Sequence, residues 1–403
     1  MSDQPLAPPI ETAIDAFLQD KGKGVTGESG TYRSDAAREL DRFVEWLREE
    51  DLGRTPTFAD FDERTFRRYA RFLVGLGNAK ATTITYYAYV SSFCGWAVDE
   101  GYLERHYAST SVAHAPLPAN DERRSGDQQA WDPEHRDRIT RYVDEQADAA
   151  IDARSNETEE NDGSVYQSIQ ACRDRALVYV LAYTAVRGAE IFRVPDDERR
   201  DGLSWRDVDL DAQSLTVFRK KQQWDEASIP APVIHPLRIY KRILDPPDED
   251  WPVFSTFHYP TLGRLVREEL AVEGYSEQEI EEIRDEHERD LLVCREYGLG
   301  PPPSITPHAA RSRMKRLCEE AEIVLDDRHG YLAPHGGRRG MGEVLVREFG
   351  YATAARYLDN SEQMVRERYS HIEAGEQADM ATAALAASDQ RVRDPSAIEE
   401  VND

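Results

Sequence analysis

The chain has 403 residues, of which 40% are hydrophobic, enough for two or three domains with packed cores. Its 77 acidic residues against 50 lysines and arginines give a formal net charge of −27. No apolar run approaches the roughly 18–20 residues of a membrane span, and the N-terminus lacks the basic and apolar regions of a secretory signal. We therefore expect a cytoplasmic protein with no membrane partner.

The cysteines are far apart in the sequence and form no CxxC pair. This pattern predicts reduced thiols and argues against disulfides or a zinc site. The four positions are Cys94, Cys172, Cys294 and Cys318.

The negative charge, taken alone, argues against nucleic acid as a partner, because nucleic acids attract basic surfaces. Proteins of extreme halophiles also carry acidic surfaces, however. In roughly molar salt the Debye length falls to about 3 Å, so that such a charge hardly repels DNA. Here the acidic residues are spread over many segments, such as residues 49–51, 159–160 and 196–198. We interpret the charge as adaptation to salt and not as information about the ligand.

Residues 8–105 are predicted to form a helical domain, because four apolar stripes recur at helical spacing. The stripes are Ile10, Ile14, Phe17 and Leu18; Ala36, Leu40, Phe43, Val44 and Leu47; Phe66, Tyr69, Ala70 and Leu73; and Ile84, Val90, Phe93, Cys94 and Ala97. Residues 106–130 lose this periodicity and are rich in proline and polar residues, which predicts an interdomain linker.

Residues 131–388 form the second predicted domain. Asp132 suits the N-cap of its first helix, and Pro133 suits the first helical position. A buried helix is expected over residues 174–183. Strands at 215–218 and 227–229, which flank a polar turn at 219–226, predict a β-hairpin.

Two acidic stretches of this domain, about 150–163 and 261–300, are interpreted as surface insertions. The second is expected to be helical, and Ser276 with Glu279 fits a capping box. From residue 309 the chain is expected to be helical nearly to 388. Residues 389–403 are polar and are predicted to be a disordered tail.

Four residues of the second domain suit attack on a DNA phosphate without a metal. Arginine grips phosphate oxygens with its planar fork and stays charged. Tyrosine can act as nucleophile if neighbouring arginines or a base offset its pKa, which is near 10 unperturbed. A lysine or histidine can protonate the leaving 5′-oxygen. The four residues are Arg187, His335, Arg338 and Tyr369.

The order and spacing of these residues resemble the tyrosine recombinase (phage-integrase) family over about residues 8–385. Segment 174–191, which carries Arg187 and Glu190, resembles its first box. His335 and Arg338 match its HxxR box, and Tyr369 follows 34 residues later (369 − 335) in a Tyr-x-His ending. The resemblance implies that both arginines clamp the scissile phosphate, Glu190 orients Arg187, His335 exchanges a proton, and Tyr369 is the nucleophile.

In this family a lysine at the tip of the hairpin protonates the leaving 5′-oxygen. Counted from the strand at 215–218, Lys220 matches best, and Lys221, one residue on, remains the alternative. Asn360 stands where the family pattern Leu-Gly-His-Ser has its histidine. An asparagine amide can still donate a hydrogen bond to a phosphate but cannot be cationic.

A second HxxR sequence, formed by His308 and Arg311, lies 61 residues before Tyr369 (369 − 308), too far for the usual spacing of the family. It is better interpreted as the start of an amphipathic helix. The buried side of that helix would carry Met314, Leu317 and Ala321.

The resemblance implies a mainly α fold with a small antiparallel β-sheet. A helical, SAM-like core-binding domain and a mixed α/β catalytic domain would form a C-shaped clamp around double-stranded DNA. Phosphate contacts are expected from one face of the first domain. The candidates are Arg67, Arg68, Arg71, Thr82, Thr83 and Tyr86.

The implied reaction passes through a 3′-phosphotyrosyl intermediate and needs neither a metal, nor ATP, nor another cofactor. The implied assembly is a monomer in solution and a homotetramer on paired sites. The alanine-rich segment 380–387 would either dock into a neighbouring protomer or pack on its own domain.

Three other functions stay open. A type IB topoisomerase shares the chemistry, but the distinct helical N-terminal domain argues against it. A DNA-binding member of the same fold with weak or lost catalysis is supported by Asn360 alone. A protein-interaction scaffold is favoured only by the acidic charge.

Overall fold

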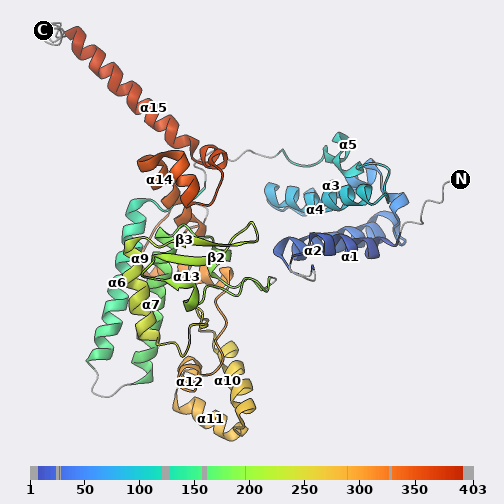
Figure 1. Cartoon of the computed structure of the whole chain (residues 1–403). Helices are drawn as coiled ribbons and strands as arrows, with labels where there is room; N and C mark the ends of the chain where they lie inside the picture. Colours follow the sequence, from blue (N-terminus) through green and yellow to red (C-terminus); the bar gives the residue numbers. More distant parts are fainter. Residues whose placement is uncertain are drawn as a thin grey trace. The chain divides into compact units, whose positions relative to one another are not determined.

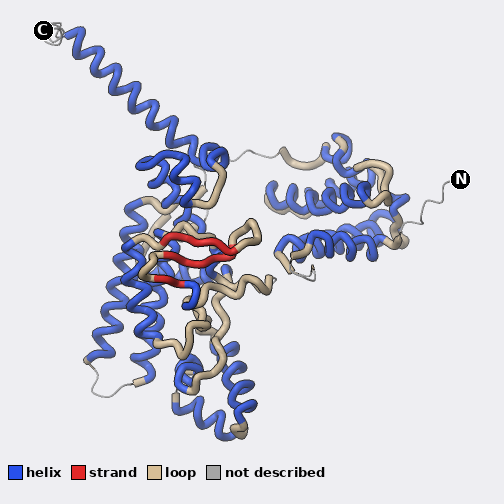
Figure 2. Tube along the Cα trace, in the orientation of Figure 1, coloured by secondary structure: helices blue, strands red, loops and turns tan. Residues whose placement is uncertain are grey.

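The computed structural model describes residues 8–23, 27, 29–119, 128–156, 161–195, 197–287, 289–325 and 329–393 (Figures 1 and 2). The chain divides into two units. Unit 1 comprises Met1–Arg123 with Pro195–Arg199, and unit 2 comprises Arg124–Val194 with Arg200–Asp403. None of the described helices combines the length and apolar character that crossing a bilayer requires.

Unit 1 is a helical bundle around an aromatic core. Its main helices are α1 (Ile10–Lys21), α2 (Thr31–Trp46), α3 (Glu63–Gly75) and α4 (Lys80–Asp99). Phe43 lies at the centre of the core, with ring centroids 5.7 Å from Phe66 and 4.8 Å from Tyr69. The predicted helices are confirmed, and each apolar stripe is buried except at Ile84, which is only partly buried.

Two expectations for unit 1 need correction. Thr83 was expected to contact a DNA phosphate, but on α4 it faces the core together with Tyr87. The Tyr87 hydroxyl donates to the Ala108 carbonyl at 2.8 Å. The predicted linker also begins too early, because Tyr107–Ser109 and α5 (Ser111–His114) are helical and bury Ala108 and Ala113 in this core. Residues 120–127 of the predicted linker lie outside the described residues.

Unit 2 is built on the helix pair α6 (Pro133–Ser155) and α7 (Asp162–Tyr183), which lie side by side in Figure 1. The short helix α8 (Gly188–Ile191) leads to a sheet of three antiparallel strands in the order β1-β2-β3. The other helices that surround the core are α9 (Ala231–Leu244), α13 (Pro307–Glu320), α14 (Pro334–Tyr357) and α15 (Glu362–Arg393).

The sheet consists of β1 (Val208–Asp209), β2 (Ser214–Phe218) and β3 (Trp224–Ser228). The hairpin is confirmed, but β3 begins earlier than predicted. Trp224 pairs with Phe218 across the strands, and their ring centroids are 5.3 Å apart. Such an aromatic pair stabilises strand pairing, so only residues 219–223 remain as the tip.

The segment predicted as a helical insertion forms α10 (Tyr259–Glu273), α11 (Glu277–Glu286) and α12 (Asp290–Glu296). The capping box at Ser276 is confirmed. The segment is more than a solvated surface, because each helix buries apolar residues and a buried ion pair joins Arg284 to Asp290 at 2.6 Å.

The other predicted insertion, 150–163, is partly helical. Its ends belong to α6 and α7, and residues 157–160 lie outside the described residues. His308 and Arg311 lie at the start of α13, as predicted, and Met314 and Leu317 are buried.

The far part of α15 extends away from the rest of unit 2 (Figure 1). Met380 and Leu385 are 66% and 67% exposed, so this far part of the helix does not pack on its own domain. The predicted tail begins within α15, which reaches Arg393, and residues 394–403 lie outside the described residues.

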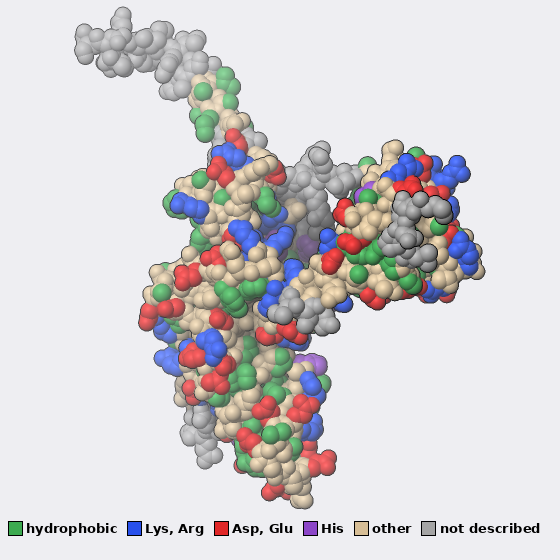
Figure 3. Space-filling view, turned by 45° about the vertical axis from the view of Figure 1, so that its right-hand side comes forward, with side chains coloured by type: hydrophobic (Ala, Val, Ile, Leu, Met, Phe, Trp, Pro, Cys, Tyr) green, Lys and Arg blue, Asp and Glu red, His purple; other side chains and the backbone are tan. Residues whose placement is uncertain are grey.

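On the face shown in Figure 3, acidic side chains are scattered over both units and do not form one acidic face. Basic side chains lie among them, and a group of lysines and arginines occupies the upper part of unit 2, below the extended helix. This face thus carries a diffuse negative charge with a local positive region.

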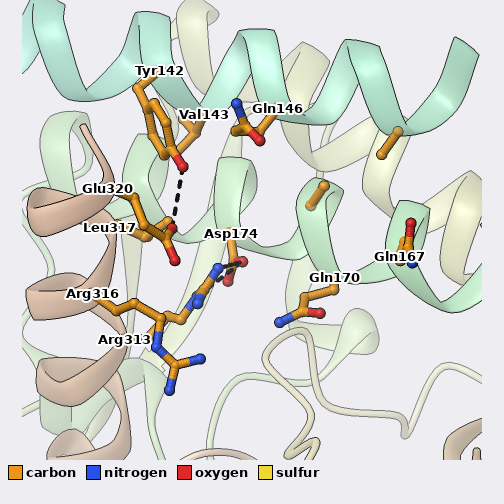
Figure 4. Close-up of a pocket in the computed structure, with 12 residues that line it drawn as sticks. Tyr142, Val143, Gln146, Gln167, Gln170, Asp174, Arg313, Arg316, Leu317 and Glu320 are labelled. Carbon is orange, nitrogen blue, oxygen red and sulfur yellow. Dashed lines mark hydrogen bonds and ion pairs between the residues drawn. The ribbon is translucent and has the colours of Figure 1, made fainter. Parts of the chain in front are cut away.

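A buried ion pair joins α7 to α13. The Arg313 guanidinium donates to Asp174 Oδ2 through Nε at 3.0 Å and Nη2 at 2.6 Å, and Arg173 lies 3.3 Å from Oδ1. Asp174 and Arg313 line a groove of about 370 Å³ between α6, α7 and α13, which Gln146, Gln167 and Gln170 also line (Figure 4).

We expect Asp174→Ala to lower the free energy of unfolding by about 3–5 kcal/mol, because it leaves two partly or fully buried arginines without their counter-charge. Urea denaturation in concentrated potassium chloride measures this. Asp211→Ala is the control, since the Asp211 side chain is 98% exposed in its pair with Arg238. Equal effects of the two variants would contradict this structural role of Asp174.

Candidate active site

Arg187 is positioned by the turn that follows α7. Ala185 in this turn has a left-handed backbone with φ of 56°. Arg187 is the N-cap of α8, and its backbone N–H donates to Glu190 Oε2 at 2.8 Å. Its guanidinium donates to Glu190 Oε1 at 2.8 Å. Glu190 is therefore the carboxylate that orients Arg187, and its side chain is 1% exposed.

Arg338 lies on α14 with 3% of its surface exposed. Its two terminal nitrogens donate to the carbonyls of Ala185 and Leu358. Burial, followed by the charge of Arg187, lowers the pKa of Arg338 to about 10. The guanidinium is still charged at neutral pH, so two positive groups face the same region of the site.

Two glycines allow α14 to lie close enough for this contact. A Cβ on Gly337 would fall 2.2 Å from the Leu181 carbonyl oxygen of α7. A Cβ on Gly340 would fall 2.3 Å from the Trp131 carbonyl oxygen. Both distances are too short for any side chain, so the glycine spacing after His335 sets the position of the helix.

The segment that precedes α6 holds the start of α14 and was missed by the sequence analysis. The Trp131 backbone N–H donates to the Gly336 carbonyl at 3.0 Å, and its indole N–H donates to the Ala333 carbonyl at 2.9 Å. Gln129 adds hydrogen bonds to Tyr331 and Ala333. The signals available in the sequence were Trp131, directly before a predicted helix start, and the separate glycine-rich run at 336–342.

His335 lies in the first turn of α14, and its side chain is exposed to solvent on one side. Loss of water around the protein-facing side of the ring, followed by the charges of Arg339, Arg338, Arg368 and Arg187, lowers the pKa of His335 to about 4. The imidazole is thus neutral at pH 7 and has a lone pair that can accept a proton.

Tyr369 lies at a kink in α15, with φ of −113° and ψ of 18°. The residue is 3% exposed, and its hydroxyl donates to the Arg339 carbonyl at 3.4 Å. A Cβ on Gly342 would fall 2.1 Å from the Tyr369 hydroxyl oxygen, so the phenol packs directly on α14. Burial raises the pKa of Tyr369, although Arg368 and Arg338 oppose the rise.

Asn360 and Asp359 complete the surroundings of Arg187. Arg187 Nη2 donates to Asn360 Oδ1 at 3.1 Å and to the Asp359 carbonyl at 3.3 Å. The Asp359 carboxylate lies 3.6 Å from Arg187 Nη1. The structure thus brings Asn360 to the first arginine, where the resemblance predicts a phosphate contact.

The hairpin tip contributes Arg219, which the sequence analysis did not single out. Arg219 is buried and donates to Glu190 Oε2 at 3.3 Å and to the Glu226 carbonyl at 2.8 Å. Of the two lysines, Lys221 reaches the cluster, with its ammonium 3.0 Å from Asp359 Oδ1. The Lys220 ammonium makes no ion pair with any described residue.

The candidate DNA contacts of unit 1 differ in their surroundings. Thr83 is 2% exposed in the core, so its predicted role as a phosphate contact is wrong for this structure. Arg68 is bound by Asp51 at 2.6 and 2.7 Å. The other four, at positions 67, 71, 82 and 86, have partly or fully exposed side chains.

No family model and no curated protein matches the chain. It is similar to the solved structure of the Tn1549 transposon integrase in complex with transposon right end DNA. The identity is 10%, the match covers 92% of this chain and 100% of that chain, and the TM-score is 0.52. For the same integrase in complex with circular intermediate DNA the identity is 10%, the match covers 90% of this chain and 95% of that chain, and the TM-score is 0.51.

This likeness shows the fold. The chain has the fold of that integrase, and the predicted fold class, mainly α with a small antiparallel sheet, is confirmed.

The packing of Tyr369 against Gly342 can be tested with Gly342→Ala. Alanine improves helix propensity by at most about 1 kcal/mol, whereas overpacking costs typically about 1–3 kcal/mol. We expect a lower free energy of unfolding by urea. Adding Tyr369→Phe removes the atom nearest the new Cβ and should recover part of the loss. Gly375→Ala, with no atom within 4 Å of its Cβ, is the control and should cause no loss.

The environment of His335 predicts a pH dependence. Its pKa in the folded chain, about 4, lies below the ordinary 6.5. As the pH falls from 6.5 to 5 the unfolded chain therefore binds a proton that the folded chain does not, and stability decreases. We expect a smaller decrease in His335→Gln than in the wild type, measured by urea denaturation. An unchanged slope would contradict this, and His308→Gln is the control.

Proposed function

We propose that this chain is a site-specific DNA recombinase that cuts and rejoins DNA through a 3′-phosphotyrosyl intermediate. One observation carries the proposal. Arg338 donates to the Leu358 carbonyl and Arg187 donates to the Asp359 carbonyl and Asn360 Oδ1, so both arginines reach the turn before α15, the helix that carries Tyr369. Two charged forks beside a tyrosine supply both the clamp and the nucleophile that attack on a phosphate requires.

Each residue has a role in the proposed reaction. Arg187 and Arg338 bind the non-bridging oxygens and offset the charge that develops on them. Asn360 supports Arg187, and Glu190 fixes its orientation. His335, neutral at pH 7, accepts the phenolic proton of Tyr369. A lysine of the hairpin tip protonates the leaving 5′-oxygen. The sequence register leaves both Lys220 and Lys221 open for this role.

The phosphotyrosyl bond conserves the energy of the cleaved diester, so rejoining needs no ATP, and the arginines provide the positive charge that a metal supplies elsewhere. In the structure the Tyr369 hydroxyl is turned toward the Arg339 carbonyl. Cleavage therefore requires the phenol to leave this hydrogen bond, and we assign that movement to DNA binding.

Double-stranded DNA is the proposed substrate, and both the helical unit 1 and the catalytic unit 2 would contact it. Arg67, Arg71, Thr82 and Tyr86 are the candidate phosphate contacts of the first domain. Because the chain carries a net charge of −27, binding should require salt high enough to screen its repulsion of DNA.

The proposed assembly is a monomer in solution and a homotetramer on two DNA sites. The exposed end of α15 supports this proposal. An isolated helix is only marginally stable in water unless it packs on a partner, and the described side chains beyond Ile372 are all exposed. A neighbouring protomer would cover this end of the helix.

We expect an SDS-resistant protein–DNA adduct with wild-type protein and none with Tyr369→Phe. The substrate is a pool of nicked fragments from the replicon that carries the gene, in roughly 2 M potassium chloride with EDTA. Arg187→Ala should form the adduct about 10²–10³ times more slowly, as expected when one group that stabilises the transition state is removed. Sequencing the trapped DNA gives the site.

Tyr351→Phe is the matched control, because Tyr351 lies on α14 and its hydroxyl donates to the exposed Glu373 at 3.3 Å. This variant should form the adduct as the wild type does. Binding without an adduct on DNA known to hold the site would favour a non-catalytic DNA-binding protein. No binding in concentrated salt would favour an interaction scaffold.

A further inference from the structure

Asp359 places a carboxylate among the positive charges of the site. Its two oxygens lie 3.0 Å from the Lys221 ammonium, 3.6 Å from Arg187 and 4.0 Å from Arg219. The side chain is 15% exposed, so these charges are only partly screened by water. Among the described residues, Asp359 and the deeper Glu190 are the carboxylates that connect the hairpin tip to Arg187 by ion pairs.

The backbone explains which residues fit this position. Asp359 has a left-handed conformation, with φ of 43°. Glycine adopts it freely, and the family pattern Leu-Gly-His-Ser has glycine here, whereas aspartate and asparagine tolerate it better than other residues do. This chain therefore keeps the turn of the pattern but adds a carboxylate to it.

Of the two lysines of the hairpin tip, the Asp359 carboxylate binds only Lys221. Lys221 is drawn to one oxygen of Asp359, and Arg187 approaches the other. One carboxylate thus bridges the Lys221 ammonium and the Arg187 guanidinium that would clamp the phosphate. Both lysines are exposed, the Lys221 side chain by 66%, so the ion pair with Asp359 is what distinguishes Lys221. The Lys220 backbone carbonyl accepts a hydrogen bond from Gln222 at 3.0 Å.

Asp359 is ionised under ordinary conditions. Burial acts to raise its pKa, but the hydrogen bond from Lys221 and the charges of Lys221, Arg219 and Arg187 outweigh it and lower the pKa of Asp359. The ionised carboxylate can therefore accept the hydrogen bond from the Lys221 ammonium, the group that would act as general acid.

We infer that Asp359 is a positioning residue that holds Lys221 beside Arg187, so that Lys221, and not Lys220, protonates the leaving oxygen. This inference rests on the proposed function. As the Tyr369 oxygen bonds to phosphorus and the bond from phosphorus to O5′ breaks, the Lys221 ammonium gives its proton to O5′ and becomes an amine. The phenolic proton goes to the neutral imidazole of His335.

The same carboxylate should disfavour the bound phosphate, because like charges so close repel. Asp359→Asn keeps the shape and the left-handed turn but removes the charge. We therefore expect it to bind the nicked site at least as tightly as wild type while cleaving it about tenfold more slowly, within the range that general acid catalysis spans. A purely structural role would not separate binding from cleavage in this way.

The test uses the DNA site that is identified by sequencing the adduct of the wild-type protein. It compares two synthetic nicked DNAs with this sequence. One has the ordinary 5′-bridging oxygen, and the other has sulfur in its place. A thiolate leaves without a proton far more readily than an alkoxide does. With oxygen, Lys221→Ala should form the adduct about 10² times more slowly than wild type. With sulfur, Lys221→Ala and Asp359→Asn should both approach the wild-type rate.

Lys220→Ala is the matched control and should cleave both DNAs as wild type does. The double variant Lys221→Ala/Asp359→Asn should be no slower than Lys221→Ala, because Asp359 acts through that lysine. Recovery of the rate with sulfur also shows that the variants are folded. Asp359→Gly, which relaxes the turn, should behave as Asp359→Asn does.

Three results would overturn the inference. In the first, Lys220→Ala loses cleavage while Lys221→Ala keeps it. In the second, Asp359→Asn cleaves the oxygen DNA as fast as wild type does. In the third, Asp359→Asn cleaves the sulfur DNA as slowly as it cleaves the oxygen DNA. If wild-type protein forms no adduct with any DNA of the pool, the proposed function itself fails and the inference falls with it. Adduct formation by wild type together with any of the first three results removes the inference alone.

Discussion

The site depends on where the Arg338 guanidinium is buried. One terminal nitrogen donates to the Ala185 carbonyl, two residues before Arg187, and the other donates to the Leu358 carbonyl, two residues before Asn360. A buried arginine without acceptors would be costly, because a charge removed from water must be compensated. One side chain therefore fixes the end of α7, the start of α14 and the turn before α15 relative to one another.

The charge of the site opposes that of the whole chain. Arg187, Arg338 and Arg219 lie close together, and the charge of Arg187 helps to lower the pKa of Arg338. Glu190 and Asp359 form ion pairs with Arg187 and Arg219, whereas Arg338 is held by the Ala185 and Leu358 carbonyls. A phosphate would supply the charge that the cluster lacks, so a diffusely acidic surface and a local anion site are compatible when salt screens the former.

The sequence predicts the elements better than the contacts between them. Helical periodicity found the main helices, because that signal is local, and the motifs, which are also local, singled out Arg187, Arg338 and Tyr369. Asp359, Arg219 and Trp131 act through residues more than a hundred positions away in the sequence, or across a turn whose geometry the sequence does not define. The register of the hairpin tip was equally open, since residues 219–223 form no strand that would fix it.

The kink at Tyr369 divides α15 into two parts with different surroundings. Before it, Val365 is buried with Leu345 and Val346 of α14, and just after it Ile372 joins the same cluster. Farther on, Met380 and Leu385 are exposed. The hydroxyl is held by one hydrogen bond of 3.4 Å, which is weak at that length. Packing against Gly342, rather than hydrogen bonding, therefore keeps the phenol in place.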